Sequence, residues 1–135
     1  MSKTKKMDVL SKAVTFYQHR DEDFISLTDI ARYRDAQRGD YIIQNWMRNR
    51  NTIEFLGIWE QLNNPDFNSI EFDGIRKQAG LNSFSLTPKR WTSTTGAIGI
   101  ITKAGRYGGT FAHKDIAFDV AETASLGYGV YIEIG

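Results

Sequence analysis

Residues 98–113 read IGIITKAGRYGGTFAH, a run of β-branched and apolar residues followed by a glycine-rich turn. Residues 98–103 favour a strand, because β-branched side chains fit the pleated surface of a sheet. The glycines within 104–109 permit tight turning and close backbone approach, and residues 110–112 can then return as the partner strand. The sequence therefore predicts a β-hairpin over residues 98–112.

The tip of this predicted hairpin is cationic. Arg106 and Tyr107 stand between glycines at the turn. Such a tip, next to a pair of helices, can lie along a groove of DNA and donate backbone N–H groups to phosphate. The glycines can equally serve the turn alone, with Tyr107 packed on the domain. His113 is a single histidine near a predicted helix start, and we expect it to be a hydrogen-bonded structural residue.

Two short helices joined by a basic loop are predicted upstream of the hairpin. Thr28 is a candidate N-cap for a helix to about residue 33, and residues 35–40 form a loop that contains Gly39. Asp40 is the candidate N-cap of a second helix over residues 41–49. The apolar residues of this second helix recur at the spacing of one buried stripe, which comprises Ile42, Ile43, Trp46 and Met47.

The opposite side of helix 41–49 is polar and carries Tyr41, Gln44, Asn45 and Arg48. In the major groove, which admits an α-helix, arginine can pair bidentately with guanine, and asparagine or glutamine with adenine. Arginines in the preceding helix and loop could neutralise phosphates, and they are Arg32, Arg34 and Arg38. A solvated polar face without any ligand explains the same pattern.

The remaining segments complete an α+β pattern and not an alternating β–α–β one. Further strands are expected at 13–18, 24–27 and 128–134, and further helices at 53–62, 72–79 and 114–124, with Thr87-Pro88 opening another. Asn51 and Glu54 resemble a capping box for helix 53–62. The predicted buried face of that helix comprises Phe55, Leu56, Ile58, Trp59 and Leu62. Residues 1–12 are expected to be a basic N-terminal tail, and residues 13–135 to form one domain.

The composition excludes several function classes. The chain has 135 residues, a mass of 15.4 kDa and 41% apolar residues, which suit one folded domain. Without cysteine there is no disulfide or thiolate metal site, and two histidines are too few for a histidine-rich metal site. We therefore expect no metal and no cofactor. No apolar run reaches the length of a membrane span, so we expect no membrane partner and a cytoplasmic location.

Charge is unevenly distributed along the chain. The formal net charge is only +1, yet residues 74–114 contain seven lysines and arginines and no acid. A local positive field of this kind attracts a polyanion although the whole molecule is nearly neutral. Chance spacing of surface charge is the alternative. Within this segment, the cations expected to reach phosphate from the hairpin side are Lys103, Arg106 and Lys114.

Three blocks of the sequence resemble, in order, the signature of the KilA-N domain family: residues 25–31 (ISLTDIA), 46–53 (WMRNRNTI) and 105–113 (GRYGGTFAH). The resemblance spans about residues 13–134. KilA-N domains occur in bacteriophage, bacterial and large DNA-virus proteins and are similar to the fungal APSES DNA-binding domains. The resemblance implies a DNA-binding fold with a helix-turn-helix-like pair and a β-hairpin wing on a small sheet. It also implies that Trp46 is buried and that no residue is catalytic.

The sequence therefore predicts a double-stranded DNA-binding module of a phage- or prophage-type regulator, in the cytoplasm of a bacterial host cell. Helix 41–49 is expected in the major groove, and hairpin 98–112 on the backbone or in the adjacent groove. The expected DNA contacts are Arg32, Arg34, Arg38, Tyr41, Gln44, Asn45, Arg48, Lys103, Arg106, Tyr107, Gly108, Gly109, Thr110 and Lys114.

Two other function classes compete with DNA binding. A protein-interaction module, such as an antirepressor that captures a repressor or another partner protein, could use an aromatic surface of Tyr17, Trp59, Trp91, Tyr128 and Tyr131. A metal-dependent nuclease could use neighbouring acids, but Asp66, Glu71 and Asp73 lack the acid-x-lysine arrangement of such a site. DNA affinity should fall steeply with added salt, whereas an apolar protein interface should be much less sensitive.

Overall fold

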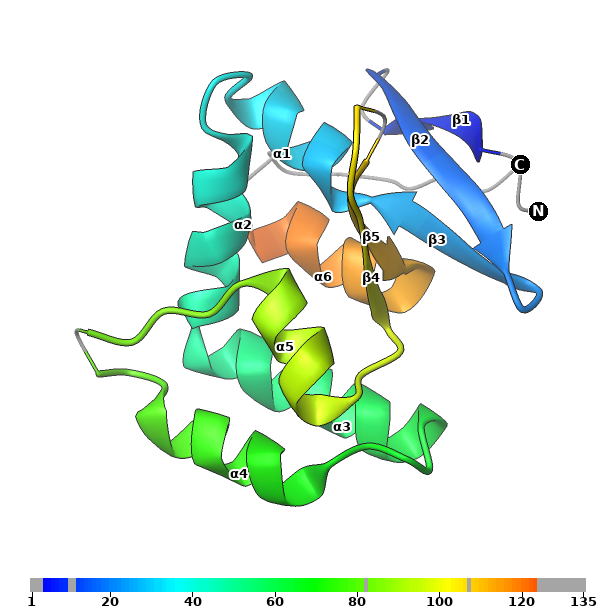
Figure 1. Ribbon diagram of the computed structural model, residues 1–135. Helices are drawn as coiled ribbons and strands as arrows, with labels where there is room; N and C mark the ends of the chain where they lie inside the picture. Colours follow the sequence, from blue (N-terminus) through cyan, green and yellow to red (C-terminus); the bar gives the residue numbers. More distant parts are fainter. Residues whose placement is uncertain (1–3, 10–11, 82, 107, 124–135) are drawn as a thin grey trace.

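The computed structural model describes residues 4–9, 12–81, 83–106 and 108–123, which form a five-stranded antiparallel sheet and six helices (Figure 1). The sheet order is β1-β2-β3-β5-β4, with β1 (Thr4–Val9), β2 (Lys12–His19), β3 (Glu22–Ser26), β4 (Ile100–Lys103) and β5 (Gly109–His113). The helices are α1 (Leu27–Arg34), α2 (Gly39–Arg48), α3 (Arg50–Asn63), α4 (Ser69–Gln78), α5 (Pro88–Thr95) and α6 (Lys114–Thr123). The predicted α+β class is confirmed, and so is the hairpin, because β4 and β5 pair antiparallel.

Strand β1 corrects the expectation of a tail over residues 1–12. It pairs antiparallel with β2, with Met7 opposite Val14 and Lys5 opposite Phe16. Because β1 is an edge strand, its sequence needs no continuous apolar pattern. The lysine-rich composition that suggested a tail therefore belongs to the edge of a sheet.

The two faces of the sheet contact different parts of the core. Phe16, Ile25 and Ile100 belong to the main core cluster, which includes side chains from all six helices. On the opposite face, which we call the outer face, Tyr17 and Phe111 form a smaller cluster together with Phe24. The rings of Tyr17 and Phe111 pack edge to face with centroids 5.1 Å apart. Alternation along the strands explains this division, since successive side chains point to opposite faces.

The N-cap of α1 is not the expected one. The hydroxyl of Ser26, and not that of Thr28, accepts the N–H of Asp29 at 3.0 Å. The Thr28 hydroxyl instead accepts the backbone N–H of Thr110 in strand β5 at 2.9 Å. Ser26 and Thr28 were both suitable caps by residue type. The Thr28 hydroxyl takes part in a long-range hydrogen bond instead, so Ser26 caps the helix.

The starts of α2 and α3 also differ from expectation. Helix α2 begins one residue before Asp40, and its N-cap Arg38 makes no side-chain cap hydrogen bond. Asn49 alone separates α2 from α3, and its side chain caps α3 by accepting the N–H of Asn51 at 2.8 Å. The capping box expected from Asn51 and Glu54 is therefore wrong, because α3 begins before Asn51 and leaves that residue inside its first turn.

The buried face of α3 is rotated relative to the predicted one. Leu56 and Trp59 are buried as expected, but Ile58 and Leu62 are 55% and 79% exposed. Helix α4 covers the neighbouring side of α3, where a Cβ on Gly57 would collide with the ring of Phe72. The side of α3 that faces α4 carries a glycine. The spacing of large apolar residues along α3 therefore could not identify this side as buried.

The remaining helices agree with the sequence pattern. Helix α4 begins three residues earlier than expected, because Asn68 caps it by accepting the N–H of Glu71 at 3.1 Å. Thr87 caps α5 with proline in its first turn, as expected. Helix α6 buries Ile116 completely and ends within one residue of its expected end. The strand expected at 128–134 lies outside the described residues.

Candidate nucleic-acid interface

The elbow between α1 and α2 is hollowed and cationic. Its depression of about 490 Å³, the elbow depression, is lined by Arg34, Asp35, Arg38, Tyr41, Ile42 and Asn45. The chain turns tightly here, because the Asp35 N–H donates to Ala31 O at 3.0 Å and Asp35 Oδ1 accepts the Gln37 N–H at 3.1 Å. Gly39 packs against α1, where a Cβ would come 3.1 Å from Arg32 Cγ. Four of the expected DNA contacts therefore share one surface.

The polar side of α2 faces solvent, as the sequence predicts. Gln44, Asn45 and Arg48 are exposed, and so is Tyr41. Arg38 Cζ lies 4.4 Å from the centroid of the Tyr41 ring, a cation–π contact at the rim of the elbow depression. This contact places the Arg38 guanidinium over the Tyr41 ring, beside the elbow depression.

The opposite side of α2 fixes the orientation of this polar face. Ile43 and Met47 are buried in the main core, as expected from the spacing. Trp46 is also buried, and its Nε1–H donates to Asp119 Oδ2 of α6 at 3.2 Å. Rotation of α2 about its axis would break this hydrogen bond, so α6 helps to hold the exposed residues in place.

Glycines shape the turn between β4 and β5 and seat the hairpin on α1. The Gly108 N–H donates to Gly105 O at 3.0 Å, and a Cβ on Gly108 would collide with Lys103 O. Gly105 has a φ of 101°, in the region that favours glycine. A Cβ on Gly109 would lie 2.8 Å from Thr28 Oγ1 on α1. The hairpin thus contacts the start of α1 directly, and its link to α2 runs through α1.

Two of the expected phosphate contacts lie away from the elbow depression. Lys103 Nζ is 3.6 Å from the centroid of the Tyr17 ring and 5.2 Å from that of Phe111, on the outer face of the sheet. Burial raises the pKa of the Tyr17 phenol above its ordinary value, so this ring is a neutral partner for the ammonium near pH 7. Lys114 is the half-buried first residue of α6.

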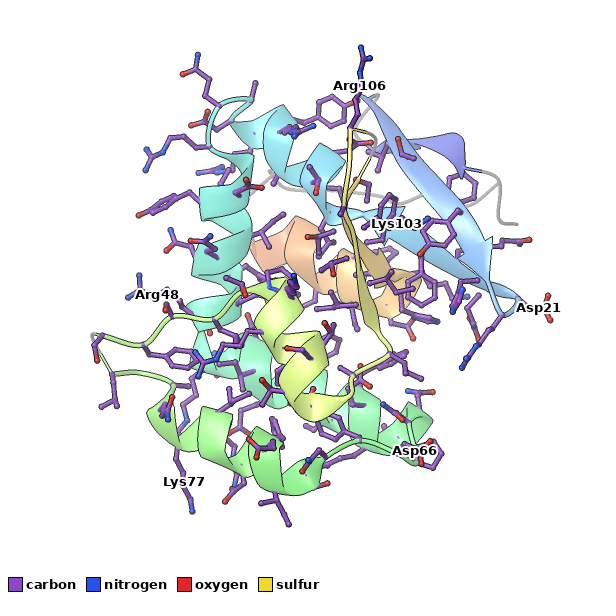
Figure 2. All side chains as sticks on the ribbon, in the orientation of Figure 1. Asp21, Arg48, Asp66, Lys77, Lys103 and Arg106 are labelled. Atoms are coloured by element: carbon purple, nitrogen blue, oxygen red, sulfur yellow. The ribbon has the colours of Figure 1, made fainter. Side chains whose placement is uncertain are left out.

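Arg106 is exposed at the hairpin tip and points away from the body of the molecule (Figure 2). The tip and the loop between α1 and α2 lie at the same end of the molecule, at the top of Figure 1. Arg48 projects from the side of α2 at its other end (Figure 2). Tyr107 lies outside the described residues. The hairpin tip and the elbow therefore share one end, which Arg48 does not reach.

Sequence reasoning missed two residues of this region. Asp35 lines the elbow depression as its acidic member, and its place in the turn was visible in the sequence because aspartate commonly bonds a nearby backbone N–H. Thr28 links α1 to the hairpin, but no local signal indicates that contact because its partner lies 82 residues away.

The sequence model of the KilA-N domain family matches residues 10–134, nearly the whole chain. The chain belongs to the KilA-N domain family. This is a family of DNA-binding-type domains and not a family of enzymes. No curated protein and no solved structure matches the chain.

Two of the three blocks that resemble the KilA-N signature, the first and the third, meet in the structure. Residues 25–31 cover the end of β3 and most of α1, and residues 46–53 join α2 to α3. The described residues of the third block, 105–106 and 108–113, belong to the hairpin turn and β5. Ile25 pairs with Ala112 in the sheet, and Thr28 bonds to Thr110. The first and third blocks therefore set how the hairpin sits on α1 of this KilA-N domain.

The arrangement of the acidic side chains does not support the nuclease alternative. Hydrogen bonds from Lys77 and Arg76 lower the pKa of Asp73, whose oxygens lie 3.1 Å and 2.7 Å from those two cations. Within the described part of the chain, no three histidine, aspartate or glutamate side chains are grouped to hold a metal ion. The same residues include no helix that is long and apolar enough to cross a bilayer.

The aromatic surface of the protein-interaction alternative is largely internal. Tyr17, Trp59 and Trp91 are 2%, 9% and 0% exposed, so these rings serve the core. Tyr128 and Tyr131 lie outside the described residues. No described member of this aromatic set is exposed enough to act as an interface anchor.

Proposed function

We propose that this KilA-N domain binds double-stranded DNA with α2 in the major groove and the β4–β5 hairpin as a wing on the backbone or in the adjacent groove. The observation that carries the proposal is the elbow depression, where Arg34, Arg38, Tyr41 and Asn45 share one exposed surface. An α-helix with its side chains is about 10–12 Å across, which suits a major groove about 12 Å wide.

The proposal divides the α2 surface into two kinds of contact. Gln44 and Asn45 offer amides that match the adenine edge, and Arg48 offers a guanidinium that matches guanine. Arg34 and Arg38, with Arg32 beside them, would hold the phosphates that flank the groove. Because phosphate contacts fix register but carry no sequence information, the arginines supply affinity and the amides supply base preference.

On the hairpin side, the proposal rests mainly on Arg106. The Thr110 N–H already donates to Thr28 and the Gly108 N–H to Gly105, so neither is left for a phosphate. Lys103 would have to leave the Tyr17 ring to reach DNA. Lys114 and Gly109 remain secondary contacts of the proposal.

The biological setting of the proposal is a phage- or prophage-type regulatory protein in the cytoplasm of a bacterial host cell. The support is the membership in the KilA-N family, over residues 10–134. Binding to an operator by this domain would regulate transcription, with double-stranded DNA as the partner.

Mobility-shift titrations on duplexes selected from random sequence, at two salt concentrations, test the proposal. Arg38→Gln should weaken binding to every duplex and reduce the slope of log K against log salt by about 0.9, the value of one phosphate contact. Asn45→Ala should cost about 1–3 kcal/mol on the selected duplex and relax the base preference at one position.

Lys77→Gln is the matched control, because it removes one positive charge from the exposed surface of α4. It should leave both the affinity and the base preference close to wild type. If Arg38→Gln and Asn45→Ala behave like this control, the assigned surface does not bind DNA.

A further inference from the structure

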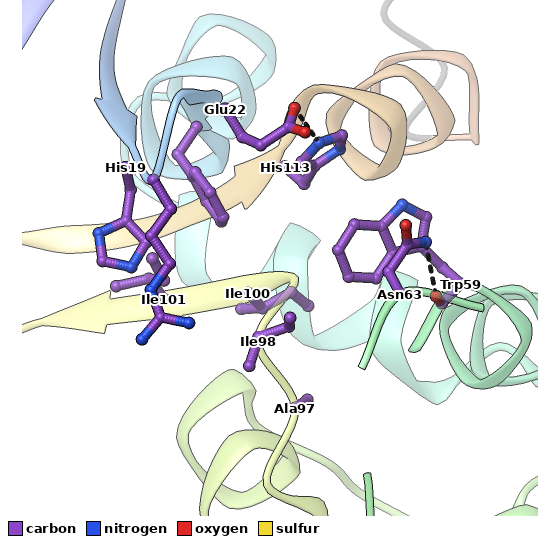
Figure 3. Close-up of a pocket in the computed structure, with 11 residues that line it drawn as sticks. His19, Glu22, Trp59, Asn63, Ala97, Ile98, Ile100, Ile101 and His113 are labelled. Atoms are coloured by element: carbon purple, nitrogen blue, oxygen red, sulfur yellow. Dashed lines mark hydrogen bonds and ion pairs between the residues drawn. The ribbon is translucent and has the colours of Figure 1, made fainter. Parts of the chain in front are cut away.

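A second concave site lies between the β2–β3 turn, the end of α3 and the start of β4 (Figure 3). Its volume is about 360 Å³, within the range of about 300–1,000 Å³ that is typical of small-molecule pockets. None of the expected DNA contacts lines it, so this pocket requires its own explanation.

One part of the pocket wall is apolar and aromatic. Phe24 and Trp59 are buried side chains whose rings flank the buried imidazole of His113, with centroids 5.8 Å and 5.0 Å from it. Ile98 and Ile101 complete the apolar lining from the start of β4. A dry apolar cavity of about 150 Å³ already admits a benzene ring, so this pocket has room for a ring and a short polar group.

His113 stabilises the pocket wall and does not offer a free polar group. Its Nδ1 accepts the Asp115 N–H at 3.2 Å, so Nε2 carries the proton and donates to Glu22 Oε2 at 2.9 Å (Figure 3). This arrangement confirms the expectation that His113 is a hydrogen-bonded residue at a helix start. It also holds the Glu22 carboxylate at the edge of the pocket.

The pocket carries one positive and one negative side chain, both from the β2–β3 turn. Arg20 and Glu22 line it, and His19 pairs with Glu22 across the two-residue loop. Arg20 and Asp21 have φ values of 53° and 64°, as in a type I′ hairpin. Glycine or asparagine usually fills these left-handed positions, and here the turn places Arg20 among the residues that line the pocket.

We propose that this pocket binds an apolar α-amino acid, with its side chain against the lining residues Phe24, Trp59 and Ile98. The carboxylate of the ligand pairs with Arg20, and its ammonium pairs with Glu22. A zwitterion matches the pocket because the lining offers one charge of each sign around an apolar interior. A simple acid would leave Glu22 facing a like charge, and a simple amine would leave Arg20 facing one.

Titration of the ¹⁵N-labelled full chain with L-phenylalanine, in the absence of DNA, tests this assignment. The Trp59 indole N–H donates to Asp115 at 3.4 Å beside the pocket, so its resonance should shift and saturate. The Trp91 indole is an internal control, because Trp91 is fully buried outside the pocket lining. 3-Phenylpropanoate lacks the ammonium and 2-phenylethylamine lacks the carboxylate, and each should bind at least about tenfold more weakly.

Two charge-neutralising variants complete the test. Arg20→Gln and Glu22→Gln should each weaken L-phenylalanine binding by about tenfold or more, and glutamine can still accept the hydrogen bond from His113. Arg50→Gln, on the exposed start of α3, is the matched control and should leave binding unchanged. The spectra themselves report whether each variant is folded.

Three results would overturn the assignment. The first is no shift of the Trp59 resonance at about 10 mM L-phenylalanine, an affinity too weak for recognition. The second is equal binding by either analogue, which would make the pocket a site for an acid or an amine. The third is unchanged binding by Arg20→Gln. None of these results depends on DNA binding, so they leave the proposed function untouched.

Discussion

Glu60 is a fully buried carboxylate in α3, and its removal should loosen the segment that leads into the hairpin. Glu60 Oε1 accepts hydrogen bonds from Asn64 Nδ2 at 2.9 Å and from the Ile98 N–H at 3.0 Å. Its Oε2 accepts the Gly99 N–H at 2.8 Å. The same Gly99 offers its carbonyl to the His113 N–H at 2.8 Å, so the carboxylate holds the backbone where β4 begins.

The cost of Glu60→Gln follows from these three hydrogen bonds. A glutamine oxygen at the Oε1 position keeps two of them, but its NH₂ group then faces the Gly99 N–H. Loss of a hydrogen bond to a charged acceptor costs about 1.5–3 kcal/mol, and relief of the buried charge offsets part of that cost. We expect a loss of about 2 kcal/mol for Glu60→Gln. Glu60→Met leaves the Ile98 and Gly99 N–H groups without their acceptor, whereas Asn64 Nδ2 keeps its hydrogen bond to Gly96 O at 3.0 Å. This substitution should cost about 4 kcal/mol or more.

Urea unfolding followed by tryptophan fluorescence measures these differences, and an unchanged slope would show that the midpoint shift reports stability. Glu54→Gln is the matched control on the same helix. Its partly exposed carboxylate lies 3.9 Å from Arg50, so its loss should change stability by less than about 0.5 kcal/mol. If Glu60→Gln is as mild as this control, or Glu60→Met no worse than Glu60→Gln, the assigned role of the carboxylate is wrong.

Three further perturbations test other contacts. Thr28→Val removes the acceptor of the Thr110 N–H and should lower the free energy of unfolding in urea by about 1 kcal/mol. In mobility-shift titrations, the effects of Thr28→Val and Arg106→Gln on DNA binding should not add up in the double variant. Gly99→Ala would place a Cβ 2.6 Å from Ile116 Cδ1 and should destabilise the fold by about 1–3 kcal/mol, which thermal unfolding would show as a lower melting temperature. Gly74→Ala is the control in α4: its Cβ would meet nothing within 4 Å, so it should raise the melting temperature slightly. Burial raises the pKa of Tyr17 above its ordinary value of 10.0. The stability that its neutral phenol contributes is therefore complete below about pH 10 and falls as the pH rises further. Tyr17→Phe should flatten this alkaline decline, measured by urea unfolding at a series of pH values.

Local chemistry explains which elements could be predicted from the sequence. The hairpin was predictable because its glycines sit where the turn needs a positive φ or a close backbone approach, as at Gly105 and Gly108. The polar and apolar sides of α2 were predictable because the helical period separates Asn45 from Trp46 by about 100°. These features depend on neighbours in the chain, which the sequence displays directly.

Long-range contacts explain what could not be predicted. Ser26 and Thr28 are equally good caps by residue type, and only the contact with β5 separates their roles. Ile58 belongs to an apolar stripe of α3, yet the neighbouring α4 packs on Gly57 instead. Lys103 belongs to a basic segment, but the fold turns it onto the Tyr17 ring from another strand. In each case the deciding partner is distant in sequence.

The placement of the cations also ranks the proposed DNA contacts. Arg106 and the elbow depression lie at one end of the molecule, whereas Arg48 lies at the other end of α2, about 15 Å from its start (Figure 2). A duplex that touches both the hairpin tip and the elbow passes over residues 41–45 of α2, near Tyr41 and Asn45. Screening at physiological salt acts over about 8 Å, so Arg48 cannot support that contact through its field and contributes only where it touches the DNA. Residues 41–45 of α2 should therefore dominate affinity and base preference.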